Sequence, residues 1–164
     1  MGWWGWGVME GDEPCDLQYI IEQSLASGVG ALDGQSDSEY EAEEIRVNDV
    51  SRAKLKAGDY MDIVAQIKDG TLTDWGDSNI ALQVLGEMIM VYGGKMDEAL
   101  KPMFIEAAES DDWAEREVKR KAEMTAFINR VIAYDGTAIE PTSRGLFDTI
   151  FTAIENGEEG LVNK

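Results

Sequence analysis

Apolar residues recur at every third or fourth position along most of this 164-residue chain, and no window alternates apolar and polar residues as a half-buried strand does. After Ser78 the helix that this spacing predicts is apolar around most of its circumference, up to Gly93 and Gly94. We expect this helix to be the most buried element. The pattern predicts an all-α fold, a single-domain bundle of five or six helices over residues 1–164.

Capping residues and glycines indicate where these helices begin and end. The expected starts lie near Asp12 (with Pro14 in the first turn), at Asp77 or Ser78, at Asp111 or Asp112, and at Thr142 or Ser143. The corresponding stops lie after Leu25, at Gly93, near Tyr134 and at Gly157. The stretch Glu115 to Glu123, which includes Arg116, Lys119, Arg120 and Lys121, is highly charged, and we expect it to be a solvated helix face.

Two segments leave alternatives open. Tyr60 to Ile67 suits a helix that ends at Gly70, and Gly58 can separate it from a turn around Ala53 to Lys56. The segment from Asp97 to Glu109 also suits a helix, but Pro102 lacks the amide that a helix interior needs. That helix therefore starts at Pro102 or kinks there.

Between about Ser27 and Glu44 the apolar pattern stops, and glycines and serines alternate with acids. A stretch of this composition cannot bury enough apolar area to offset the entropy of ordering it. We expect a flexible acidic loop over residues 27–44, after the first helix, which serves as a linker or as a functional loop.

The chain carries 33 acidic and 14 basic residues, a formal net charge of −19. Such a surface repels nucleic acid and anionic membranes and attracts a basic protein. The candidate partner-binding acids lie in and beside the expected loop: Asp33, Asp37, Glu39, Glu41, Glu43 and Glu44. The alternative is that acidity only keeps the protein soluble.

Much familiar chemistry is absent because the chain has no histidine and one cysteine, Cys15. Without histidine, the Ser-His-Asp triad, the Cys-His dyad and the histidine-based zinc helix are excluded, and a lone cysteine excludes an internal disulfide. The sequence also lacks a glycine-rich phosphate loop. We therefore expect a protein that is not an enzyme and needs no cofactor or metal.

One enzymatic alternative remains, based on two carboxylate pairs. Glu41 and Glu44 form an E-x-x-E pair, and Asp59 and Asp62 form a D-x-x-D pair. On two packed helices these four groups could hold Mg²⁺, an arrangement faintly similar to the helical nucleotide pyrophosphohydrolases. In a chain with 33 acids, however, paired spacing also arises by chance.

No apolar run reaches the length of about 18 residues that a membrane-spanning helix needs. The amino-terminal segment has neither a basic region nor a following apolar block, so it does not resemble a secretory signal. We expect a cytoplasmic protein in a reducing compartment, with no membrane partner and with Cys15 buried.

The opening run Trp4-Gly5-Trp6-Gly7, followed by Met9 and two acids, resembles the start of a family of uncharacterised bacterial and bacteriophage domains. Members begin with W-G-x-G, an apolar residue and an acidic D-x-x-x-D, and the resemblance covers roughly residues 3–134. The matching signature residues are Trp4, Gly5, Gly7, Asp12 and Asp16, while Met9 replaces the more usual phenylalanine. The family has no assigned activity, so the resemblance implies a helical fold and a bacterial or bacteriophage origin, but no mechanism.

The physical chemistry of this opening motif favours a structural role. Gly5 and Gly7 allow positive φ or close approach to a neighbour, and the indoles bring apolar surface to the bundle. Asp12 suits an N-cap, and Asp16 favours the positive end of the helix dipole. The alternative is an exposed aromatic patch for a partner, which requires two of the three indoles to be exposed.

These observations lead to one principal hypothesis and two alternatives. The principal one is a non-catalytic acidic protein of a bacteriophage or mobile element, a DNA mimic in charge, which binds and blocks a basic nucleic-acid-binding host protein in the host cytoplasm. The alternatives are the Mg²⁺-dependent pyrophosphohydrolase and a structural domain that associates with itself as a homo-oligomer.

Overall fold

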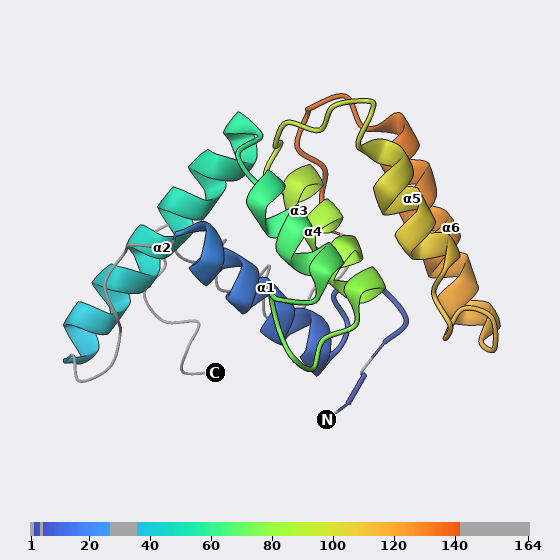
Figure 1. Ribbon diagram of the computed structural model, residues 1–164, viewed down its shortest axis with the longest axis horizontal. Coiled ribbons are helices and arrows are strands. Elements are labelled where there is room, and N and C mark those ends of the chain that lie inside the picture. Colours follow the sequence, from blue (N-terminus) through green and yellow to red (C-terminus); the bar gives the residue numbers. More distant parts are fainter. Residues whose placement is uncertain (1, 4, 27–35, 142–164) are drawn as a thin grey trace.

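Six α-helices make up the computed structural model, which describes residues 2–3, 5–26 and 36–141 (Figure 1). They are α1 (Asp12–Leu25), α2 (Asp37–Ala57), α3 (Met61–Asp69), α4 (Ser78–Val91), α5 (Lys101–Glu109) and α6 (Val118–Ala133). Within these ranges there is no strand, only an isolated bridge between Trp3 and Gly11. The all-α fold predicted from the sequence is confirmed. The helix expected from Thr142 or Ser143 to Gly157 lies outside the described residues.

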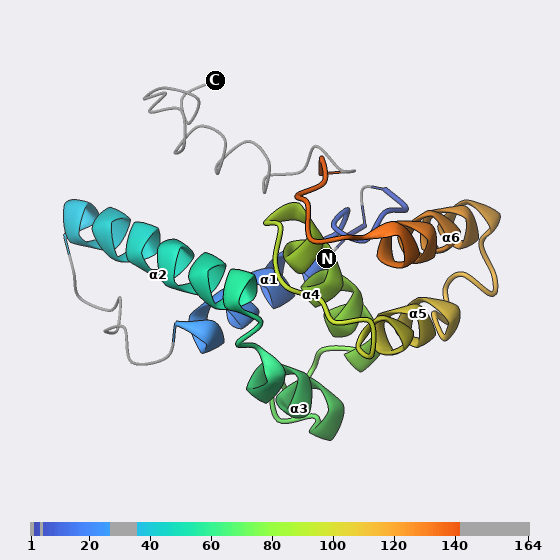
Figure 2. The ribbon, with the colours of Figure 1, turned by 90° about the horizontal axis from the view of Figure 1, so that it is seen from above.

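Helix α4 is the centre of the fold, as its apolar circumference predicts. Every residue from Ala81 to Met90 is buried, and α1, α2, α3 and α5 all pack against this helix. Helix α6 packs on α5, so that α2 and the α5–α6 pair lie at opposite ends of the molecule (Figures 1 and 2). Gly86 lets α4 approach α5 and α6 closely, because a β-carbon at this position would lie 3.0 Å from the rings of Phe104 on α5 and Phe127 on α6.

Helix α2 is the longest of the described helices and packs along one stripe only. Its buried residues Glu43, Val47, Ser51 and Leu55 are four apart, with Asn48 beside them. All residues from Ser36 to Ala42, at its amino-terminal end, are exposed. This end extends away from the other described helices, as Figure 2 shows.

The expectation of an acidic loop over residues 27–44 is wrong for residues 37–44, because α2 begins at Asp37. Ser36 caps the helix: its side chain accepts from the amide of Glu39, and the Glu39 carboxylate accepts from the amide of Ser36, 2.9 Å away. Acids in a first turn also face the positive end of the helix dipole. Their charge therefore favours the helix.

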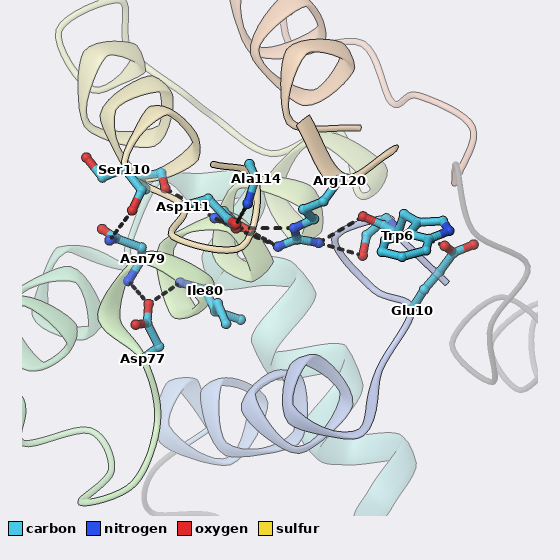
Figure 3. Close-up of polar contacts among 12 residues, drawn as sticks. Trp6, Glu10, Asp77, Asn79, Ile80, Ser110, Asp111, Ala114 and Arg120 are labelled. Carbon is cyan, nitrogen blue, oxygen red and sulfur yellow. Dashed lines mark hydrogen bonds and ion pairs between the residues drawn. The ribbon is translucent and has the colours of Figure 1, made fainter. Parts of the chain in front are cut away.

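Several other boundaries differ from expectation. The turn expected around Ala53 to Lys56 is the last turn of α2, which ends at Gly58 with a φ of 77°. Helix α1 has Gly11 rather than Asp12 as its N-cap. Helix α5 starts at Lys101 with Pro102 in its first turn, which agrees with the expected start at Pro102 and not with a kink there. Asp77 caps α4 as expected, accepting from the amides of Asn79 and Ile80 (Figure 3). None of the described helices is long and apolar enough to cross a bilayer.

Candidate functional site

The exposed end of α2 collects several of the predicted partner-binding acids. Asp37, Glu39 and Glu41 are exposed in its first turns, and Glu44 is half-buried. Glu39 is occupied by the cap, since hydrogen bonds from the Ser36 amide and hydroxyl lower the pKa of its carboxyl. Asp33 lies outside the described residues.

Glu43 does not belong to this surface. It lies in the buried stripe of α2, 9% exposed, and its carboxylate is 3.5 Å from the guanidinium of Arg46. Its prediction as an outward partner-binding acid is therefore wrong. Glu43 lies in line with the buried Val47, Ser51 and Leu55 because it is spaced from them by multiples of four residues.

Exposed apolar side chains lie among these carboxylates. Ile45 is 45% exposed and Tyr40 is 42% exposed. Glu41, Ile45 and Asp49 are four residues apart and exposed, so an apolar side chain lies between two carboxylates along one line of the helix. Apolar anchors surrounded by polar groups are typical of protein-binding surfaces. We call the exposed residues Asp37, Tyr40, Glu41, Ile45 and Asp49 the α2 surface.

The exposed surface is acidic, as the net charge of the sequence predicts. Of the residues that the structure describes, 19 acids but only 7 bases are exposed. Lys101 and Arg120 are buried, and Arg52 and Arg130 are half-buried, Arg130 in an ion pair with the buried Glu87 at 3.0 Å. Four acids, Glu22, Glu43, Glu87 and Asp111, are buried as well, so burial leaves the surface acidic without adding to its charge.

A second polar centre surrounds Arg120, which is fully buried (Figure 3). Its guanidinium donates to Asp111 Oδ2 at 2.8 Å and to Gln83 Oε1 at 2.9 Å. It also donates to the backbone carbonyls of Trp6 and Gly7, each at 3.0 Å, and the Nε–H donates to Asp111 at 3.2 Å. All five N–H donors of the guanidinium are thus satisfied within the protein.

Aromatic rings and a carboxylate complete the Arg120 centre. The guanidinium carbon lies 5.1 Å from the ring centroid of Trp3 and 4.9 Å from that of Trp113, distances typical of cation–π contacts. Burial alone would raise the pKa of Asp111, but hydrogen bonds from Arg120, Gln83 and the Ala114 amide hold it below its ordinary value. Asp111 therefore stays ionised and paired, and the centre offers no free group to a ligand.

The opening motif lies against this centre. Gly5 and Gly7 fold around Glu10, whose carboxylate accepts from the Gly7 amide at 2.9 Å, and a β-carbon on Gly5 would overlap that carboxylate. Asp12 accepts from the Gly2 amide at 2.8 Å, and Asp16 is exposed on α1. Trp4 lies outside the described residues.

The indoles of the opening motif that the structure describes are packed. Trp3 and Trp6 are half-buried, with ring centroids 4.9 and 5.1 Å from that of Trp113. The geometry of these two rings favours anchoring of the amino-terminal segment over an exposed aromatic patch.

Sequence reasoning missed Arg120, which it placed on a solvated helix face. The expectation was wrong because Arg120, Met124, Phe127 and Val131 form the buried stripe of α6. Their spacing of four, three and four residues was a usable signal. Asp111 was expected to open this helix, but α6 starts at Val118, and Asp111 instead binds Gln83 and Arg120.

The four carboxylates of the metal alternative do not come together. Glu41 and Glu44 lie near the start of α2, whereas Asp59 and Asp62 lie beyond its end. The helix between Glu44 and Ala57 is about 20 Å long at 1.5 Å per residue. Across the described ranges, no group of three or more candidate ligand residues could hold a metal ion.

Comparison with known proteins gives no relative: no protein-family model, no curated protein and no solved structure matches the chain. The similarity of the opening motif to the uncharacterised bacterial and bacteriophage family stays a prediction.

Proposed function

We propose that this protein is a non-catalytic acidic interaction protein that binds and blocks a basic, nucleic-acid-binding protein. The observation that supports this function best is the excess of exposed carboxylates described above. Among the residues that the structure describes, 19 acids and 7 bases are exposed. This excess favours a basic partner and disfavours direct contact with nucleic acid.

The α2 surface is the part of the molecule best suited to this contact. Asp37, Glu41 and Asp49 are exposed over 12 residues of one helix, about 18 Å in length. A DNA duplex of that length carries roughly ten phosphates. Because α2 is less densely charged than DNA, the apolar side chains of Tyr40 and Ile45 would have to supply part of the affinity.

The proposed setting is a bacteriophage or mobile element, as the resemblance of the opening motif implies. In that setting the protein would act in the host cytoplasm and occupy the basic cleft of a nuclease, polymerase or restriction component. The carboxylates would compete there with phosphates for the same lysine and arginine side chains.

The test begins with affinity capture from host lysate, followed by titration of the purified captured protein at increasing salt. We expect a Kd between nanomolar and micromolar that weakens steeply with salt, as screened charge pairs do. Nucleic acid should compete for the captured protein. Absence of binding, or binding that salt does not weaken, would contradict the proposal.

Matched variants separate the α2 surface from overall charge. The triple variant Asp37→Asn, Glu41→Gln, Asp49→Asn should weaken binding at least about tenfold, a loss of roughly 1.4 kcal/mol. The control Glu106→Gln, Glu109→Gln, Asp112→Asn removes the same charge from exposed positions on and after α5. Equal losses in the two variants would show that net charge, and not α2, attracts the partner.

Two further assays address the alternatives. Light scattering of the purified protein tests self-association. Incubation with nucleoside triphosphates and Mg²⁺ tests for hydrolysis. We expect no pyrophosphate release, because the Glu41–Glu44 pair lies far from the Asp59–Asp62 pair.

A further inference from the structure

The contact between α1 and α2 is unusually polar for the interior of a helical fold. On α1, Gln18 and Glu22 are each 7% exposed. Three of the five buried residues of α2 are polar: Glu43, Asn48 and Ser51. Buried polar groups depend on their hydrogen bonds and on their charge state far more than buried apolar groups do.

Glu22 is the group in this contact whose charge state matters most. Its carboxylate accepts a hydrogen bond from Gln18 Nε2 at 3.0 Å, on its own helix. Burial raises the pKa of Glu22 to about 7; the Gln18 hydrogen bond and the charge of Arg52 oppose this rise, and Glu44 adds to it.

The charged groups that face Glu22 come from α2. Arg52 and Glu44 both belong to that helix, and the Arg52 guanidinium lies 4.8 Å from the ring centroid of Tyr92, at the end of α4. Helix α4 also buries Glu87, but that carboxylate binds Arg130 of α6. The buried side chains of α3, which also packs on α1, are apolar: Ile63, Val64 and Ile67.

We propose that the α1–α2 contact is a pH-responsive joint, in which α2 packs closely on α1 while Glu22 is neutral and loosens when Glu22 ionises. Moving α2 away lets water reach the carboxylate, whose burial disfavours the charged form. The packed state therefore holds the proton of Glu22 more tightly than the loosened state does.

The direction of the pH effect follows from this difference. The pKa of Glu22 is about 7 in the packed state, against an ordinary value of 4.5. Packing is fully favoured below pH 4.5, weakens as pH rises from 4.5 to about 7, and changes no further above that range. Because α2 carries the proposed partner surface, the joint would change how that surface is presented.

Amide hydrogen exchange of the full chain measures this loosening directly. Protection of the α2 amides of Val47, Ser51 and Leu55, corrected for intrinsic exchange, should fall at least about tenfold between pH 5 and pH 8. Amides of the central α4 should change less. The variant Glu22→Gln keeps the side-chain size and stays neutral, so its α2 protection should not depend on pH.

The control Asp16→Asn removes one charge from an exposed position of the same helix and should keep the pH dependence. Wild-type α2 protection that is constant between pH 5 and pH 8 would overturn the inference. So would equal pH dependence in Glu22→Gln, because another group would then be the sensor.

A second measurement decides the matter if Glu22→Gln does not fold. In the wild-type protein, NMR titration of the Glu22 carboxyl carbon should give a midpoint near 7, with the α2 amide shifts following the same midpoint. A midpoint near 4.5 would overturn the inference. Both measurements report packing within the chain, so their outcome does not depend on whether a basic partner binds.

Discussion

At the scale of single residues, Arg120 shows how a charged side chain can occupy a position in an apolar stripe. Its charge faces the Asp111 carboxylate, and its remaining donors reach Gln83 and two backbone carbonyls. A buried ion pair is tolerated when its geometry is good and its other hydrogen-bonding groups are satisfied. Removing the guanidinium or the carboxylate leaves the remaining charged and polar groups buried without hydrogen-bond partners.

We therefore predict that Arg120→Ala lowers the free energy of unfolding by about 3–5 kcal/mol. Arg120→Lys should also destabilise the fold, because an ammonium group has three donors and cannot reproduce the planar guanidinium geometry. Urea denaturation measures both effects. The control Arg116→Ala, at an exposed position, should change stability by no more than about 0.5 kcal/mol. If Arg120→Ala costs no more than this control, the centre does not anchor the fold.

The sequence contained part of the information about this centre. The period of α6 places Arg120 with Met124 and Phe127, so its burial could be read from the spacing. Its partners could not, because Asp111 and Gln83 come from other segments and the carbonyls of Trp6 and Gly7 carry no side-chain signal. Local patterns report faces of helices, whereas this centre depends on how distant segments meet.

At the scale of elements, Gly86 sets how closely α4 approaches α5 and α6. A β-carbon at Gly86 would lie 3.0 Å from the rings of both Phe104 and Phe127. We predict that Gly86→Ala changes stability little, because a gain of about 1 kcal/mol in helix propensity offsets the crowding.

Gly86→Val should instead destabilise by about 2–3 kcal/mol, since two more methyl groups crowd the same rings and valine is a poorer helix former than alanine. Thermal and urea denaturation measure the difference. Ala65→Val, at an exposed position of α3, controls for helix propensity alone. Equal effects at the two positions would mean that packing at Gly86 is not limiting.

The elements that sequence reasoning placed well have strong apolar periods. Helices α3 and α4, with their ends at Gly70 and near Gly93, follow this rule. The start of α2 was predicted wrongly because the prediction followed the polar composition of this stretch and not the order of its residues. Ser36 and Glu39 form an S-x-x-E capping box that the sequence already contains. Of the candidate site, the exposed acids Asp37, Glu39 and Glu41 were predictable, but their place on a helix beside Ile45 was not.

At the scale of the whole molecule, a net charge of −19 opposes the compact state through self-repulsion. Salt screens this repulsion, with a Debye length of about 10 Å at 0.1 M. We predict that the urea midpoint rises when NaCl increases from about 10 mM to about 300 mM. The variant Glu106→Gln, Glu109→Gln, Asp112→Asn should be more stable at low salt and less sensitive to salt. A midpoint that falls with salt would show that attractive ion pairs, such as Glu87–Arg130, outweigh repulsion.

The bonds from Arg120 to the carbonyls of Trp6 and Gly7 join positions 114 and 113 residues apart. A ribosome makes the opening segment before α6, so the guanidinium that holds it is made only after five of the six described helices. Closing so long a loop carries an entropic cost that earlier contacts reduce. Because Trp3 and Trp6 pack against Trp113 and the Trp6 carbonyl accepts from Arg120, we expect docking of this segment to be among the last steps by which the newly made chain folds.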